Sequence, residues 1–213
     1  MSHESDSEVL ALHSIRIQGG PGLSDIAERF DLDYHFVHDY LQHARDRGWV
    51  APYTFAGKTS WSLTHTGKAE NERQLAAELD DIGARAAVTE AHATFLPLNS
   101  RHGQVCTRWQ IKPTPTNPLA FNDHTDVRWD NTVLRALVGI ARELEDLCAR
   151  LSEVLLRFDG HATRYRDALN HARSGDHAWL DSPDRASCHI LWIQLHEDLL
   201  ATLGIPRGTD TSA

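Results

Sequence analysis

The sequence has few cysteines and no long apolar run. Its three cysteines, Cys106, Cys148 and Cys188, lie far apart and form no CxxC pair. This pattern excludes a disulfide scaffold and predicts a reducing compartment. No apolar stretch approaches the roughly 20 residues that a membrane helix needs, and the acidic start MSHESDSEVL is unlike a signal peptide. We therefore expect a cytoplasmic protein without a membrane partner.

Motifs of catalysis are also missing. The sequence contains no GxSxG, HExxH, P-loop or GxGxxG pattern, so no common nucleophile, metal or nucleotide motif points to an enzyme. Cys188 and His189 are adjacent, and on a helix their side chains point apart, which prevents a direct nucleophile–base pair. We expect neither an enzymatic activity nor a cofactor.

What the chain does contain is a helix–turn–helix pattern between residues 23 and 48. A first short amphipathic helix is predicted by apolar residues at i, i+3, i+4 and i+7, namely Leu23, Ile26, Ala27 and Phe30. Ser24 can cap it, and Asp33 can cap the helix that follows. The buried face of that second helix consists of Phe36, Val37, Tyr40, Leu41 and Ala44. Gly48 is a typical C-terminal residue for this helix.

A β-hairpin is predicted after Gly48. Residues 49–50 and 61–63 have the composition of two short strands. The tip between them, Ala56-Gly57-Lys58-Thr59-Ser60, is a glycine-containing hairpin signal. Thr64 can cap the helix that follows the second strand.

The fragments LSDIAERF, VHDYLQHARDRGWV and WSLTHTGKAE, in this order, resemble the winged helix-turn-helix domain of bacterial regulators of the MarR and PadR kind. The resemblance covers about the first third of the chain. It implies a DNA-binding domain at residues 8–67, whose second helix enters the major groove of double-stranded DNA. It also implies a homodimer, because such domains read two half-sites about one helical turn apart.

The candidate DNA contacts fall into three groups. The second helix carries the candidates for reading base edges, which we call the reading face: Tyr34, His35, His38, Asp39 and Gln42. The hairpin tip offers Lys58, Thr59 and Ser60 to the minor groove or to phosphates. Further phosphate candidates are Ser24, Arg45, Arg47 and Lys68.

The charge of the chain argues against tight DNA binding. The sequence has 21 basic and 30 acidic residues and a net charge of −9, whereas DNA affinity rests mainly on Lys and Arg. The reading helix begins Asp33-Tyr34-His35-Phe36, without a Lys or Arg. Regulators can be acidic overall and basic on one face. The alternative is a protein-interaction module built on a winged helix that no longer binds DNA.

Residues 68–205 carry the pattern of a helical bundle. Helices are predicted from Lys68 to Pro97, at 98–111, 127–158, 161–173 and 185–203, with a proline-containing loop after residue 111. The fold class is therefore mainly α: an N-terminal winged helix-turn-helix with a small β-hairpin wing, followed by a C-terminal helical bundle domain. That domain is expected to bind an effector and to dimerise through the stripe Leu75–Ala86 or Leu134–Phe158.

Aromatic and polar side chains in this second domain suggest a small-molecule site. The aromatic candidates are Trp109, Trp129, Trp179 and Trp192, and the polar ones are Arg101, His102, Gln110, Asn122, Asp123, His124, His177, His189 and His196. Loops at 112–126 and 174–184 are long enough to be functional. On the last helix, His189, Trp192 and His196 share an otherwise apolar face, so its histidines need partners in a ligand or in a buried polar network.

The 14 histidines raise the question of a metal site. Only His35 and His38 have the i, i+3 spacing of two ligands on one helix, and both belong to the reading face. His189 and His196 are separated by about 10 Å along a helix, although His124 with Asp126 can join one of them. We predict no metal site from this spacing.

Overall fold

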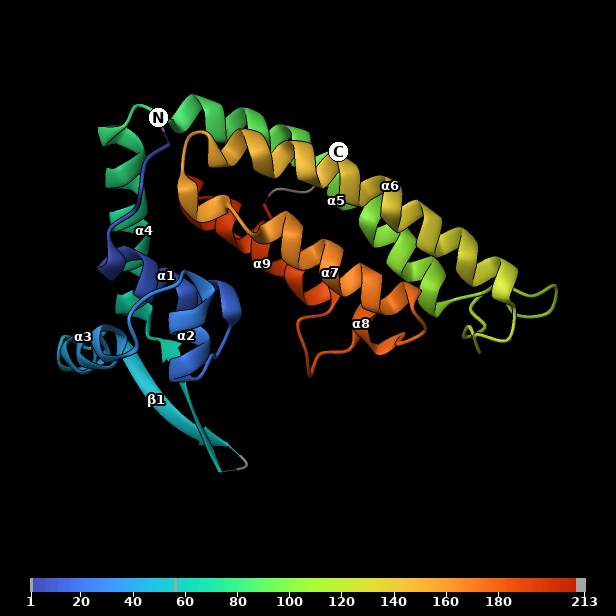
Figure 1. The fold of residues 1–213 in the computed structure, drawn as a ribbon, viewed down its shortest axis with the longest axis horizontal. Helices are drawn as coiled ribbons and strands as arrows, with labels where there is room; N and C mark the ends of the chain where they lie inside the picture. Colours follow the sequence, from blue (N-terminus) through green and yellow to red (C-terminus); the bar gives the residue numbers. More distant parts are fainter. Residues whose placement is uncertain (1, 56, 210–213) are drawn as a thin grey trace. The chain divides into compact units, whose positions relative to one another are not determined.

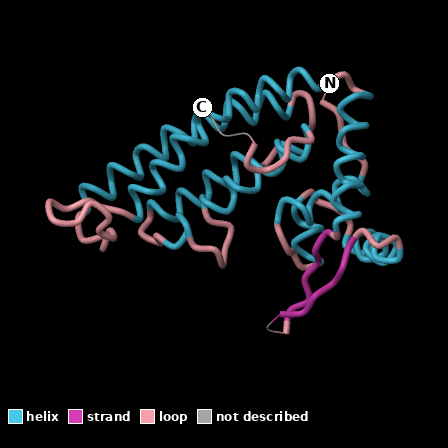
Figure 2. Tube along the Cα trace, turned by 180° about the vertical axis from the view of Figure 1, so that it is seen from behind, coloured by secondary structure: helices cyan, strands magenta, loops and turns pink. Residues whose placement is uncertain are grey.

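The computed structural model describes residues 2–55 and 57–209. It is mainly helical, with a two-stranded antiparallel sheet among the described residues (Figures 1 and 2). Its elements are α1 (Ser7–Gln18), α2 (Leu23–Arg29), α3 (Tyr34–Asp46), β1 (Val50–Phe55), β2 (Lys58–Leu63), α4 (His65–Asp81), α5 (Arg85–Gln110), α6 (Val127–Ser152), η1 (Leu156–Phe158), α7 (His161–Arg173), α8 (Ala178–Asp181) and α9 (Cys188–Leu203).

The chain forms two compact units that interleave along the sequence. The first unit consists of residues 2–89, Ser152–Arg157 and Ile193–Thr209, and the second of Glu90–Leu151 and Phe158–Trp192. Helices α5 and α9 therefore each contribute residues to both units. The expected domains at 8–67 and 68–205 are consecutive ranges, and that division stays a prediction.

The core of the first unit is built by α1, α2, α3 and the hairpin. Leu12 and Ile15 of α1, Ile26 of α2 and Leu41 of α3 are fully or almost fully buried and belong to one cluster. Val37, Tyr40 and Ala44 are also buried, so the predicted inner face of α3 is confirmed. Phe36 is half-buried against the same cluster.

Capping explains where these helices begin. The Asp33 carboxylate accepts a hydrogen bond from the Phe36 N–H at 2.8 Å, and the Thr64 hydroxyl accepts one from the Gly67 N–H at 3.0 Å, as predicted. The prediction for Ser24 was wrong. Helix α2 already starts at Leu23 after Gly22, and the Asp25 carboxylate accepts from the Gly22 N–H at 2.8 Å.

The hairpin is longer than the sequence indicated. Val50 pairs with Leu63 at its base and Phe55 with Lys58 near its tip. Ala56 of the predicted tip lies outside the described residues. Both strands are edge strands, so Pro52 of β1 is tolerated although it lacks an N–H donor. Helix α4 starts close beside β1 because residue 67 is glycine: an added Cβ would lie 1.8 Å from the Trp49 carbonyl oxygen.

The helix boundary expected at Pro97 was wrong. Gly83, at φ +63°, separates α4 from α5, and its N–H donates to the Asp80 carbonyl at 3.2 Å. Pro97 lies inside α5, where its side chain is exposed. Proline removes a single helix hydrogen bond, and α5 continues to Gln110 because Phe95, Leu98 and Val105 on its other side are buried.

In the second unit, α5 and α6 run side by side in opposite directions (Figures 1 and 2). The Arg101 guanidinium of α5 holds both carboxylate oxygens of Glu143 of α6 at 2.8 Å. Helix α6 ends at Ser152, earlier than predicted, and η1 follows after a turn.

Most residues of the apolar stripes offered as dimer contacts are buried inside the chain, although Ile82 is half-buried and Ala86 is exposed. Leu75 and Leu79 on α4, Leu137 on α6 and Phe158 in η1 have no exposed surface. The buried residues of the stripes belong to the cores of the two units, so they are not free to contact a second copy. Among the described residues, no helix combines the length and apolar character needed to cross a membrane.

Candidate functional sites

The reading face on α3 is exposed. Tyr34 retains 48% of its surface, and the side chains of His38 and Asp39 retain 54% and 76%. His35 is exposed as well, and Gln42 is half-buried. The helix is anchored from the opposite side by its buried residues, which leaves these polar groups available to a partner.

The charged side chains of α3 lie close to residues of opposite charge or to an aromatic ring. The His38 imidazole Nδ1 lies 3.0 Å from the Asp39 carboxylate, and Arg45 lies 3.7 Å from Asp46. Arg47, just after the helix, places its guanidinium 4.8 Å from the Trp49 ring. Exposed pairs of this kind contribute about 1 kcal/mol or less, so a phosphate can displace these carboxylates. The two arginines of this segment, Arg45 and Arg47, thus both lie at the C-terminal end of α3, beside Asp46.

The hairpin carries a second exposed polar surface in the same unit. Figures 1 and 2 show it extending away from α1, α2 and α3. Lys58 and Thr59 are exposed near its tip, and Ser60 is half-buried. The phosphate candidates Ser24 in α2 and Lys68 in α4 are also exposed. The first unit thus presents most of the predicted DNA contacts to solvent.

The predicted ligand residues do not all converge. His102 and Trp192 lie in the core of the second unit, with their rings stacked at 4.0 Å between centroids. The Trp192 N–H donates to the Asn99 side chain at 2.8 Å. Burial, with a smaller effect of His189, lowers the pKa of His102 to about 3. These two residues follow the buried-network alternative, because Asn99 accepts from Trp192 and the His102 Nδ1 lies 3.6 Å from the Cys106 sulfur inside the core.

Other predicted ligand residues have separate partners. Arg101 pairs with Glu143, and the Trp129 N–H donates to the Arg108 carbonyl at 2.8 Å. Trp179 stacks on His171 at 4.5 Å. Asp123 accepts two hydrogen bonds from Thr125. Gln110 donates to Asp181 at 3.0 Å.

The prediction that His189, Trp192 and His196 of α9 share a buried, otherwise apolar face was wrong. Trp192 is buried, but His189 is exposed and His196 is half-buried. The two histidines also belong to different compact units. The turn of the helix directs His189 to solvent, so it needs no buried partner.

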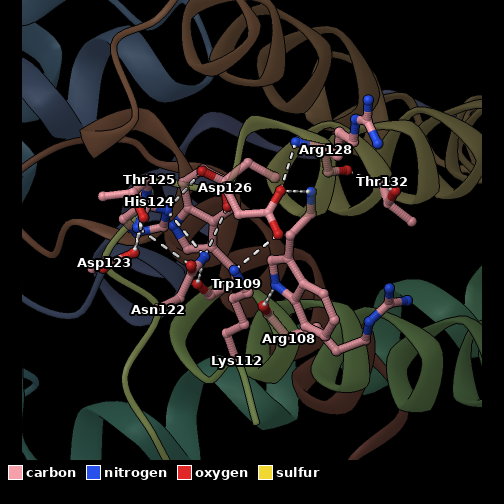
Figure 3. Close-up of polar contacts among 12 residues, drawn as sticks. Arg108, Trp109, Lys112, Asn122, Asp123, His124, Thr125, Asp126, Arg128 and Thr132 are labelled. Carbon is pink, nitrogen blue, oxygen red and sulfur yellow. Dashed lines mark hydrogen bonds and ion pairs between the residues drawn. The ribbon is translucent and has the colours of Figure 1, made fainter. Parts of the chain in front are cut away.

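The structure brings four predicted residues together with Asp130, which was not predicted. We call this group the His124 cluster: Trp109, Asn122, His124, Asp130 and His177. The Asn122 amide nitrogen lies 2.8 Å from one Asp130 oxygen and 2.9 Å from the Trp109 carbonyl. His124 Nδ1 lies 3.1 Å from the other Asp130 oxygen. The Trp109 ring contacts His124 at 4.3 Å and His177 at 5.0 Å between centroids. Figure 3 shows Trp109, Asn122 and His124 linked at this point.

The loop after α5 folds back to form this cluster. Ile111 and Phe121 make an antiparallel bridge, and the Asn122 N–H donates to the Gln110 carbonyl at 2.8 Å. Asp126 then caps α6, because its carboxylate accepts from the Arg128 and Trp129 N–H groups (Figure 3). His124 sits between these anchors at φ +59°.

Sequence reasoning missed Asp130 of the His124 cluster. It lies in the first turn of α6, where an acid is expected from the helix dipole alone, so it was not distinguished from an ordinary capping-region carboxylate. It is nevertheless only 5% exposed. The predicted start of this helix at Val127 was the one signal that placed Asp130 within reach of the loop.

Comparison with known proteins assigns no family to the chain. No family model, no curated protein and no solved structure matches it. Function is therefore inferred from the chain's own residues.

Proposed function

We propose that this chain is a DNA-binding transcriptional regulator whose first unit is a winged helix-turn-helix of the MarR and PadR kind. The supporting observation is the exposed polar reading face of α3, held on a core of α1, α2 and a projecting hairpin. The order α1, α2, α3, β1, β2, α4 is the order typical of such domains. The resemblance of the three sequence fragments is the second support.

In the proposed complex, the N-terminal half of α3 lies in the major groove. Gln42 can pair with adenine, and His35 and His38 can donate to guanine. Arg45 and Arg47 contact phosphates beside the groove. The hairpin tip, with Lys58, reaches the neighbouring minor groove or its phosphates.

The proposal includes a homodimer and a small-molecule effector. Two copies are needed to read two half-sites, and their contact uses a surface other than the buried leucine stripes. An effector bound in the second unit would favour one spacing of the two reading helices and so change DNA affinity. The His124 cluster is the group of predicted ligand residues that supports this part.

The alternative is a winged helix that docks on protein. It is favoured by one observation: α3 has no Lys or Arg from Tyr34 to Ala44, while Asp39 belongs to the reading face and Asp33 and Asp46 lie at the two ends of the helix. A negative surface of this kind is repelled by phosphates and attracts basic partners.

A mobility-shift titration of the full chain against random and genomic DNA, repeated at increasing salt, separates the two functions. We expect complexes at low salt whose affinity falls with salt, with a log–log slope of about −0.9 per neutralised phosphate. Lys58→Ala should make the slope less steep. The control Lys112→Ala, which removes a lysine paired with Asp126 in the second unit, should leave it unchanged.

The opposite result favours the protein-docking function. Absence of any complex at low salt would show that the acidic surface excludes DNA. A complex that is insensitive to salt would likewise be inconsistent with phosphate contacts.

A further inference from the structure

The His124 cluster contains a set of metal-binding side chains that local sequence spacing did not bring together. His124, Asp130 and His177 each place one ligand atom within 4.8 Å of the others. They come from three separate segments, the loop before α6, the first turn of α6 and the residue before α8. We propose that these three side chains bind one divalent transition-metal ion of the zinc class. The inference is independent of DNA binding.

The donor set determines the kind of metal. Two imidazole nitrogens and one carboxylate oxygen suit zinc, nickel or cobalt better than calcium or magnesium, which prefer oxygen ligands. Zinc binds such atoms at about 2.0–2.2 Å, so ligand atoms around a tetrahedral ion are roughly 3.3 Å apart. Small side-chain movements bring atoms that already lie within 4.8 Å to that separation.

The surroundings hold the ligands in place. Asp130 is almost fully buried, and one of its oxygens accepts from the Asn122 amide at 2.8 Å. The Trp109 ring packs against both imidazoles. Hydrogen bonds and packing around metal ligands orient them and strengthen binding. The buried carboxylate also supplies the negative charge that attracts a cation.

The contact between His124 and Asp130 indicates which nitrogen of His124 carries the hydrogen before a metal binds. The Asn122 amide has two hydrogens, and it has closer acceptors in Asp130 and in the Trp109 carbonyl. His124 Nδ1, at 3.1 Å from the second Asp130 oxygen, therefore carries a hydrogen and donates a hydrogen bond to the carboxylate. Coordination through Nδ1 breaks this N–H bond and forms the metal–nitrogen bond, while the proton is exchanged through solvent to Nε2, so that the metal-bound imidazole stays neutral in its other tautomer.

Three protein ligands leave one position of a tetrahedral ion open. In proteins this position is filled by water or by an added ligand. The His124 side chain retains 33% of its surface, so solvent can reach the site. An anionic or nitrogen-containing small molecule can therefore bind the metal directly.

Metal titration of the untagged full chain, after removal of bound metal with a chelator, tests the proposal. We expect one equivalent of Zn²⁺ to compete with a chromophoric chelator, and Co²⁺ to give the visible absorption of four-coordinate cobalt. His177→Ala and Asp130→Asn should each weaken Zn²⁺ binding at least tenfold, since loss of a supporting residue alone costs about 10- to 100-fold. His177→Ala is the main variant, and circular dichroism melting verifies that each variant folds.

Matched controls separate this site from the other histidines. His171→Ala removes an exposed histidine of α7 outside the His124 cluster, and His35→Ala removes half of the i, i+3 pair on α3. Both should keep wild-type affinity. Absence of saturable binding to the wild type would overturn the proposal. Wild-type affinity in folded His177→Ala, or a loss confined to His35→Ala, would overturn it as well.

Discussion

Histidine side chains occupy very different environments in this chain. His13 is fully buried and lies 2.9 Å from the Asp198 carboxylate. His102 is buried against aromatic rings, whereas His38 is exposed on α3. Burial removes water from an imidazole and disfavours its charged form, while a neighbouring carboxylate favours it. The protonation of a histidine in this chain therefore depends on its own burial and on its own neighbours.

The low pKa of His102 predicts an acid-sensitive fold. Its pKa is about 3 when folded, against an ordinary value of 6.5, so between these pH values the unfolded chain binds a proton that the folded chain does not. The free energy of unfolding should therefore decrease as the pH falls from about 6.5 toward 3. Urea unfolding of His102→Phe, which keeps a ring for stacking on Trp192, should show a weaker dependence on pH.

A control of the same chemistry tests this assignment. His171→Phe, on the exposed side of α7, should keep the wild-type dependence between pH 7 and 4. If His102→Phe and the wild type lose stability equally over this interval, His102 is not the group responsible.

At the scale of elements, the features that depend on local sequence spacing were predicted best. The Asp33 and Thr64 caps and the buried face of α3 follow from short-range spacing and were confirmed. The boundary between α4 and α5 was misplaced, because exposed Pro97 is tolerated once the opposite side of the helix is buried. Strand β1 was underpredicted because Pro52 argues against a strand, although an edge strand accommodates it.

The candidate ligand site was predicted only in part, because local sequence patterns do not report contacts between separate elements. The sequence indicated the two loops that meet at the His124 cluster and named His124, Asn122 and Trp109. It did not separate these residues from His102 and Trp192, which are just as aromatic and polar but pack in the core. Asp130 was missed because its partners lie in other elements, and local periodicity does not report such contacts.

The cap of α3 provides a test at this scale. Asp33→Ala removes the acceptor of the Phe36 N–H and should lower the free energy of unfolding by about 0.5–2 kcal/mol, measured by urea denaturation. Asp33→Asn keeps an acceptor oxygen and should recover most of this loss. The amide also removes a negative charge beside the reading face, so DNA affinity should not fall.

Equal destabilisation by Asp33→Ala and Asp33→Asn would argue against the cap. In that case the negative charge at the helix N-terminus, and not the hydrogen bond, would be the stabilising feature.

At the scale of the whole molecule, helix α1 and the part of α9 from Ile193 onward belong to the same unit. Asp198 of α9 contacts His13 of α1, and Glu197 contacts Arg16 at 2.9 Å. These pairs are separated by more than 180 positions, so no local pattern predicts them. The last helix therefore supports the unit that carries the reading face, even though the sequence suggested consecutive domains.

The most direct test of the central claim compares DNA binding of two double variants by fluorescence anisotropy. His38→Ala/Gln42→Ala alters the reading face, and His171→Ala/Gln104→Ala changes the same residue types on exposed positions of the second unit. The probe is the tightest genomic fragment from the mobility-shift titration.

We predict that the reading-face variant loses at least about tenfold in affinity for this fragment, since base contacts are worth roughly 1–3 kcal/mol each, while the control binds like the wild type. Wild-type affinity in the folded reading-face variant, or an equal loss in both variants, would contradict the proposal that this side of α3 recognises DNA.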